Sequence, residues 1–239
     1  LSERRTKTAI WIIKLFRTMI ENVWGMSIYE RDDDGGEEQD IASADIVNTF
    51  NACGATTLCL DLIASGIDRE LVLECIKLGV AMLFKEGGAL AVQKTMYNHL
   101  YETDSEFFFL QLRKIMSELI SWHDWSGVTT LEDDEEPDLP DDIISVRFMQ
   151  LMCEGHYCPN QDILREQPGK LVSINLLDDM VSYLVCLGRI PCKTSTAAAL
   201  AVGATVLEVI QGPCEGNQDH FSLNTSLIET LNHQMRARV

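Results

Sequence analysis

The stretch Ala197-Ala-Ala-Leu-Ala-Val-Gly-Ala-Thr-Val-Leu-Glu208-Val-Ile-Gln211-Gly-Pro-Cys-Glu-Gly-Asn-Gln218 is a small apolar run that ends in polar groups. A second apolar run ends in the same way, at Arg147-Phe-Met-Gln-Leu-Met-Cys-Glu154-Gly-His156. A carboxylate at a helix C-terminus interacts unfavourably with the helix dipole, by roughly 0.3–1 kcal/mol. Two such endings therefore predict one shared site that uses both carboxylates.

The rest of the chain predicts an all-α fold. Apolar residues recur at intervals of three and four, and the period-two alternation of a strand is absent. Helices that follow one another through short polar turns are typical of an armadillo- or HEAT-like α-solenoid of stacked helix pairs, although no repeat identity is evident. The predicted helices cover residues 3–29, 45–64, 68–84, 89–100, 107–122, 143–153, 160–165, 173–187, 195–211 and 226–235.

Two acidic runs divide the chain. Residues 30–40 contain seven acidic side chains and predict a mobile loop, and residues 132–142 contain eight and predict a linker. We therefore expect an N-terminal helical half at 1–131 and a C-terminal helical half at 143–239. Most of the net charge of −18 comes from these runs.

The composition excludes several function classes. The basic residues are scattered, which argues against a nucleic-acid partner. The most membrane-like segment, residues 9–20, contains two basic residues and is too short to span a bilayer, so we expect no direct membrane insertion. The eight cysteines lack a framework spacing and predict reduced, buried thiols. The enzyme motifs GxSxG, GxxxxGK[ST] and HExxH are absent from the sequence, so we expect that this chain is not an enzyme.

Four motifs in this order resemble one known family. They are Arg147-Phe-x-Gln-Leu-x-Cys-Glu-Gly-His156, Asn160-Gln-Asp-Ile-Leu-Arg165, Ile174-Asn-Leu-Leu177 and Gln211-Gly-Pro-Cys-x-Gly-Asn-Gln218. Together they are similar to the RIH-associated domain of the ryanodine receptor and inositol trisphosphate receptor family of intracellular calcium-release channels. The resemblance covers most of residues 53–218, and it supports the solenoid prediction.

The resemblance implies a regulatory module on the cytosolic face of the endoplasmic or sarcoplasmic reticulum membrane. It implies that Glu154 and Glu208 are calcium ligands, with Gln211 and His156 close around the ion. The implied partners are the C-terminal and pore domains of the same channel and the other subunits of a homotetramer. Calcium prefers six to eight oxygen ligands. These residues would supply part of that shell, and the C-terminal domain would supply the rest, so we expect weak calcium binding by this chain alone.

Simpler interpretations of the same residues stay open. Glu154 and Glu208 could be solvated helix ends, with His156 as a C-terminal cap. Cys153, His156 and Cys158 could suggest zinc, but they lack a second ligand pair, and reduced core thiols explain them more simply. The alternative function is a helical-repeat adaptor for protein partners, without ion chemistry.

Overall fold

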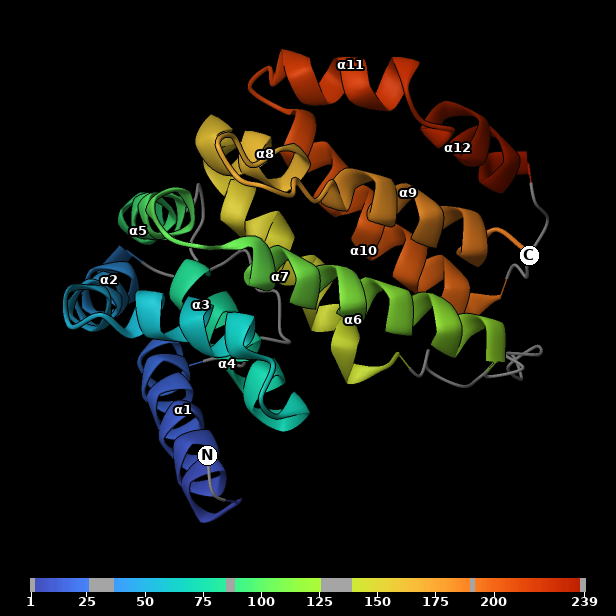
Figure 1. The fold of residues 1–239 in the computed structure, drawn as a ribbon. Coiled ribbons are helices and arrows are strands. Elements are labelled where there is room, and N and C mark those ends of the chain that lie inside the picture. The colour runs from blue at the N-terminus through green and yellow to red at the C-terminus, as the bar shows by residue number, and fades with distance from the viewer. Residues whose placement is uncertain (1–2, 26–36, 85–88, 126–138, 190–191, 237–239) are drawn as a thin grey trace.

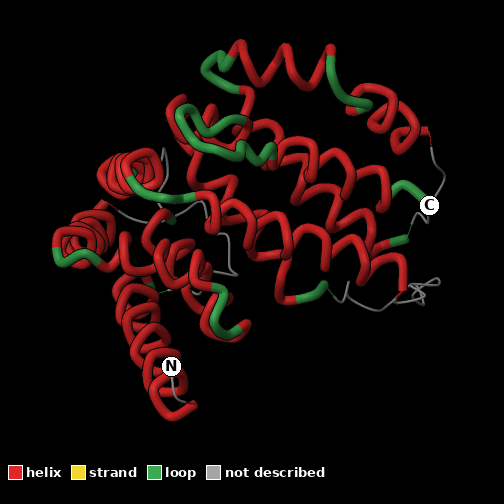
Figure 2. The backbone as a smooth tube through the Cα atoms, in the orientation of Figure 1, coloured by secondary structure: helices red, strands yellow, loops and turns green. Residues whose placement is uncertain are grey.

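The computed structural model describes residues 3–25, 37–84, 89–125, 139–189 and 192–236, and all regular structure in these ranges is helical (Figure 1; Figure 2). The all-α class predicted from the sequence is confirmed. The α-helices are α1 (Glu3–Trp24), α2 (Glu37–Ala52), α3 (Ala55–Ser65), α4 (Arg69–Leu83), α5 (Leu90–Glu102), α6 (Glu106–Trp125), α7 (Ile144–Cys153), α8 (Cys158–Arg165), α9 (Leu176–Leu187), α10 (Lys193–Ile210), α11 (Glu215–Leu223) and α12 (Leu227–Arg236). Two short 3₁₀-helices, η1 (Asp141–Ile143) and η2 (Glu154–His156), precede and follow α7.

Helices α3 to α11 form three repeats of three helices each. Equivalent helices stack on one another: α3 on α6 and α6 on α9, α4 on α7 and α7 on α10, and α5 on α8 and α8 on α11 (Figure 1). Stacked helical repeats bury a continuous core between neighbours, which is the defining property of a solenoid. The solenoid prediction is therefore confirmed, with one refinement. Each repeat has a third helix in addition to the predicted pair, namely α5, α8 and α11.

The structure differs from the prediction for the helix at 45–64 and for the acidic loop at 30–40. The predicted helix 45–64 is two helices, α2 and α3, whose axes differ by 62°. Gly54 lies between them with φ +86°, a left-handed conformation that glycine adopts without steric cost. The predicted acidic loop 30–40 overlaps α2, because residues 37–40 are helical, while residues 30–36 lie outside the described residues.

Helices from both predicted halves pack against each other. Phe148 in α7 is fully buried, and its ring lies 6.5 Å from the ring of Phe108 in α6. A Cβ atom on Gly79 of α4 would lie 2.5 Å from the Phe148 ring, so only glycine permits this approach. The predicted linker 132–142 connects the first and second helices of the middle repeat. Only its residues 139–142 are described, and there Asp142 is buried and paired with Arg69.

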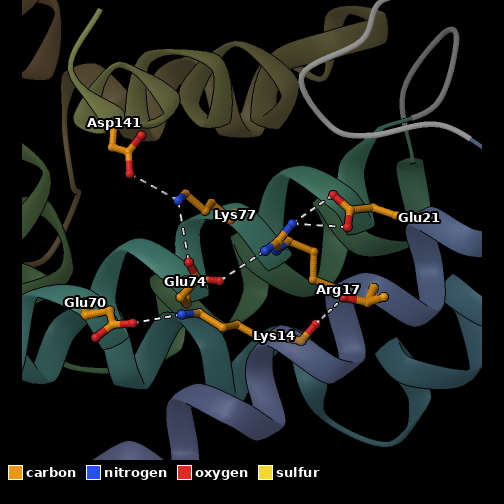
Figure 3. Close-up of polar contacts among 8 residues, drawn as sticks. Lys14, Arg17, Glu21, Glu70, Glu74, Lys77 and Asp141 are labelled. Atoms are coloured by element: carbon orange, nitrogen blue, oxygen red, sulfur yellow. Dashed lines mark hydrogen bonds and ion pairs between the residues drawn. The ribbon is translucent and has the colours of Figure 1, made fainter.

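Ion pairs hold α1 against α4 (Figure 3). Glu74 of α4, whose side chain is 7% exposed, accepts a bond from Arg17 at 3.4 Å and pairs with Lys77 at 3.5 Å. Arg17 also contacts Glu21 at 2.9 Å, and Lys14 contacts Glu70 at 2.8 Å. Since the central carboxylate is buried between two cations, this network fixes the orientation of α1 on the first repeat.

A buried glutamine of one repeat binds the end of the second helix of the next repeat. Each glutamine donates through Nε2 to two carbonyl oxygens that the ending helix leaves without partners. The bonds are Gln93 to Leu151 O (3.1 Å) and Glu154 O (2.7 Å), and Gln161 to Glu208 O (2.6 Å) and Gln211 O (2.9 Å). These contacts repeat with the same spacing at the ends of α7 and α10. They place both predicted ligand-bearing ends in equivalent positions of neighbouring repeats.

A buried asparagine near the end of the same helix also recurs in neighbouring repeats. Asn160 donates to Met152 O at 2.8 Å and to Gln93 O at 3.4 Å, and Asn217 donates to Val209 O and Gln161 O at 2.8 and 2.9 Å. Both asparagines are fully buried. The sequence carries the signature as Glu154-Gly-x4-Asn-Gln161 and Gln211-Gly-x4-Asn-Gln218. This short signature is an internal repeat, and it corrects the expectation that the sequence shows no repeat identity.

Helix α10, and not the segment 9–20 named from the sequence, is the single helix of the described ranges that is long and apolar enough to cross a membrane, by length and composition alone. Helices α7, α8, α9 and α11 all pack against it. Its inward side includes the fully buried Ala198, Val202 and Val209. Core helices of helical repeats pass the same test, because their neighbours cover them on several sides.

Candidate functional site

The first component of the site is the turn that ends α7. The chain leaves the helix through Gly155 at φ +69° and His156 at φ +64°. A histidine in the left-handed region is uncommon, and such a conformation persists only when surrounding contacts hold it. Gln93 supplies one such contact by binding the Glu154 carbonyl. The turn therefore holds Glu154 and His156 at the junction of α7 and α8.

The second component is the turn that ends α10. Gln211 is the last residue before the chain turns through Gly212 at φ +98°. A Cβ atom on Gly212 would lie 2.7 Å from Cβ of His156, so the two turns abut at this glycine. Close backbone approach of this kind requires a residue without a side chain. The structure thus brings Glu154, His156, Glu208 and Gln211 into one region, although they come from two repeats.

Gln161 fixes the second turn, a role that was not predicted from the sequence. Its side chain is 1% exposed and donates to the carbonyls of Glu208 and Gln211. Without this amide, two helix-end carbonyls would be buried without donors, which costs about 1–3 kcal/mol for each group. The signal that could have identified it is the recurrence of Asn-Gln five and six residues after the glycine of each turn.

The Glu208 carboxyl lies in an unfavourable electrostatic environment. Its pKa is raised, first by burial and then by the negative charge of Glu154, while His156 and Arg147 partly offset the increase. One of its oxygens, Oε2, is buried and has no hydrogen-bond partner among the described residues. Buried carboxylate oxygens are nearly always paired with a donor or a cation. This oxygen and the nearby Glu154 charge together favour a bound cation.

Cys153 lies beside both glutamates but is not suited to be a ligand. Its thiol is fully buried, and its pKa is raised well above the ordinary value, first by burial and then by Glu208. A thiol in such surroundings stays protonated and is inert. All eight cysteines are free, as predicted, and six of them are buried; Cys53 and Cys158 are exposed, which corrects the prediction of buried thiols at these two positions.

The donors present suit a hard cation. Two carboxylates and one amide carbonyl are oxygen ligands of the kind that Ca²⁺ accepts, but they provide fewer than the six to eight that it requires. The unpartnered Glu208 oxygen is the observation that fits such an ion. The residues therefore fit a partial calcium site, and the assignment of Glu154, Glu208, Gln211 and His156 to calcium stays a prediction.

Residues 142–235 match the family model described as "RyR and IP3R Homology associated". The match contains both turns, all four predicted site residues, and helices α7 to α11. It confirms the resemblance to the RIH-associated domain for this part of the chain. The resemblance predicted for residues 53–141 lies outside the match and stays a prediction.

Proposed function

We propose that this chain is a regulatory helical-repeat module of an intracellular calcium-release channel, and that it contributes part of a calcium-sensing site. The match of residues 142–235 to the RIH-associated domain supports the channel class, which is a regulatory family and not an enzyme family. The single observation that carries the site is the buried, unpartnered oxygen of Glu208 beside the charge of Glu154. The proposed location of this module is the cytosolic face of the endoplasmic or sarcoplasmic reticulum membrane.

Glu154 and Glu208 would hold the ion directly, and Gln211 and His156 would lie around it. Bound Ca²⁺ would supply the positive charge that the two carboxylates lack. The rest of the shell would come from the C-terminal domain of the same channel. Because Gln93 and Gln161 fix the two turns to neighbouring repeats, the carboxylates move with the solenoid as a unit. A site shared by two domains binds the ion best in one relative arrangement of those domains. That difference in affinity, present in each subunit of a homotetramer, biases the equilibrium between the closed and open pore.

The test is calcium activation of the parent channel reconstituted in planar bilayers, with Glu208→Gln compared with Glu229→Gln. Glu229 is exposed on α12, so its substitution is a matched loss of one carboxylate. We expect Glu208→Gln to shift half-activation to at least about tenfold higher calcium, equivalent to about 1.4 kcal/mol. Glu229→Gln should leave it unchanged. Equal activation of the two variants would reject the calcium site, and absence of channel activity from the parent protein would reject the channel class.

An adaptor function without ion chemistry is favoured by one separate observation. Helix α1 exposes an apolar stripe of Trp11 (74%), Leu15 (57%) and Met19 (42%) at a spacing of four residues. Such a stripe is the form in which one amphipathic helix meets another. If this function holds, Trp11→Ala should abolish partner binding measured by sedimentation, whereas Glu208→Gln should have no effect.

A further inference from the structure

A second cluster of ligand-type side chains lies beside the glutamate site. Cys158 and Asp162 are one turn apart on α8, and Cys214 immediately precedes α11. The Cys158 thiol donates to Asp162 Oδ2 at 3.5 Å, and the Cys214 thiol donates to Asp162 Oδ1 at 3.6 Å. The two sulfur atoms and the carboxylate all lie within 4.8 Å of one another. Two repeats thus converge on one carboxylate.

The fold positions each member of this cluster. Arg165 Nη2 binds Asp162 Oδ1 at 2.9 Å, and Arg165 also binds Asn217 of α11. Asn217 in turn donates to Gln161 O, which fastens α11 to α8. An outer contact that orients a carboxylate ligand is a regular feature of metal sites. The cluster is therefore held by the same contacts that join the second and third repeats.

The donor set is characteristic of a borderline-soft divalent cation. Zn²⁺ binds thiolates and carboxylates in tetrahedral geometry, and three protein ligands leave the fourth position open to solvent. Cys158 is exposed, which gives an ion access, and Cys214 is buried. The zinc interpretation of Cys153, His156 and Cys158 lacked a second ligand pair in the local sequence. Cys214, 56 residues along the chain from Cys158, supplies the ligand that local spacing could not reveal.

Zinc coordination at this cluster would release protons. Both thiols donate to the Asp162 carboxylate in the structure. A divalent cation would displace the two thiol protons to solvent, so that two metal–sulfur bonds replace two weak hydrogen bonds.

We propose that Cys158, Asp162 and Cys214 bind one Zn²⁺ ion, which clamps α8 to the turn between α10 and α11. Cys158 follows His156 by two residues, and Cys214 follows Gln211 by three. The clamp therefore joins the two turns of the glutamate site without sharing a ligand with it. Zinc binding here does not require that the glutamate site binds calcium.

The test is a Zn²⁺ titration of the full chain, reduced with a phosphine, against a colorimetric zinc chelator. Cd²⁺ serves as a second probe, because its thiolate-to-metal absorption counts coordinated sulfurs. We expect one ion and two thiolates per chain, with proton release on binding. Cys158→Ser and Asp162→Asn should each weaken zinc binding at least about tenfold. Cys53→Ser, at another exposed cysteine, should leave the affinity unchanged.

Cys158→Ser is the decisive variant because its side chain is exposed, and circular dichroism verifies that the variant stays folded. The proposal is overturned if the reduced chain binds no zinc, or if Cys158→Ser binds it as tightly as the native chain. It is also overturned if Glu208→Gln removes zinc binding while Cys158→Ser does not, since the ion would then occupy the glutamate site. Loss in Cys158→Ser with retention in Glu208→Gln supports it, whether or not calcium binds.

Discussion

At the scale of single residues, Glu208 determines a pH dependence of stability. Its pKa is raised above the ordinary value of 4.5 in the folded chain, so the folded state holds the proton more tightly than the unfolded state. Stability from this group is complete below about pH 4.5 and is lost as the pH rises through the raised pKa. The ionised carboxylate is thus a cost at neutral pH.

We therefore expect Glu208→Gln to have a higher free energy of unfolding than the native chain at neutral pH without calcium. The difference should shrink as the pH falls to about 4.5, because both side chains are then uncharged. Urea denaturation across this range measures it, with Glu229→Gln as the exposed control. A difference that does not change with pH would contradict the buried, repelled state of this carboxylate.

Gly212 is the residue where the two turns touch, and its substitution tests that contact. Gly212→Ala places a Cβ atom at φ +98° and 2.7 Å from Cβ of His156, so we expect a loss of about 2–3 kcal/mol. His156→Gly in the same chain should recover part of that loss, since the two residues are in contact. Denaturant unfolding of the double-mutant cycle measures the coupling.

Gly203 provides the control for this cycle. It lies within α10 with an ordinary backbone conformation, and a Cβ atom there would meet nothing within 4 Å. Gly203→Ala should therefore stabilise the chain by about 0.5–1 kcal/mol through helix propensity. If Gly212→Ala behaved in the same way, the turns would not abut as described.

At the scale of elements, the helix ends depend on one buried amide in each repeat. Gln161→Leu keeps the side-chain volume but removes the donor to Glu208 O and Gln211 O. We expect a loss of about 2–4 kcal/mol, because two buried carbonyls are left unsatisfied. The matched control is Gln218→Leu, in the equivalent exposed position. Its amide donates to Ile210 O at 2.9 Å, but water can replace this exposed bond, so stability should change by less than about 0.5 kcal/mol. Thermal unfolding compares the two, and equal effects would contradict the structural role of Gln161.

The sequence predicted elements better than it predicted their junctions. The helix predicted at 68–84 matches α4 closely, because its start depends on local chemistry: the Asp68 side chain caps the helix by accepting a bond from the Leu71 amide at 3.0 Å. The kink at Gly54 was missed because apolar periodicity continues across it. Helix α11 was missed because its residues 215–223 are mostly polar, and packing against α8 and α10 stabilises it.

The candidate site was partly predictable for a similar reason. Two helix ends with carboxylates suggested that Glu154 and Glu208 act together, and the charge of Glu154 does raise the pKa of Glu208. The contact of Gly212 with His156 and the convergence of Cys158 with Cys214 depend on how repeats stack, and no local pattern encodes that. The repeated Gly-x4-Asn-Gln signature was the one sequence feature that reports the stacking register.

At the scale of the whole molecule, the stacking of the repeats predicts that the helices on both sides of the acidic linker fold as one cooperative unit. The middle repeat takes α6 from one side of residues 132–142 and α7 and α8 from the other. Phe148 packs against Gly79 and Phe108, and Arg113 of α6 binds Asp179 of α9 at 2.9 Å. Separation of the halves would expose this apolar interface to water on both pieces.

We therefore expect that the pieces 1–131 and 132–239 do not fold when expressed apart but form a complex when co-expressed. Each piece alone should lack a sharp unfolding transition, because neighbouring repeats supply much of each other's stability. Sedimentation and circular dichroism of the separate and mixed pieces measure this. Phe148→Ala should weaken the complex by about 3–5 kcal/mol, whereas Leu200→Ala, on the outer face of α10 with the leucine 70% exposed, should not. Two independent, cooperative transitions from the separate pieces would instead show that the acidic linker joins two autonomous domains.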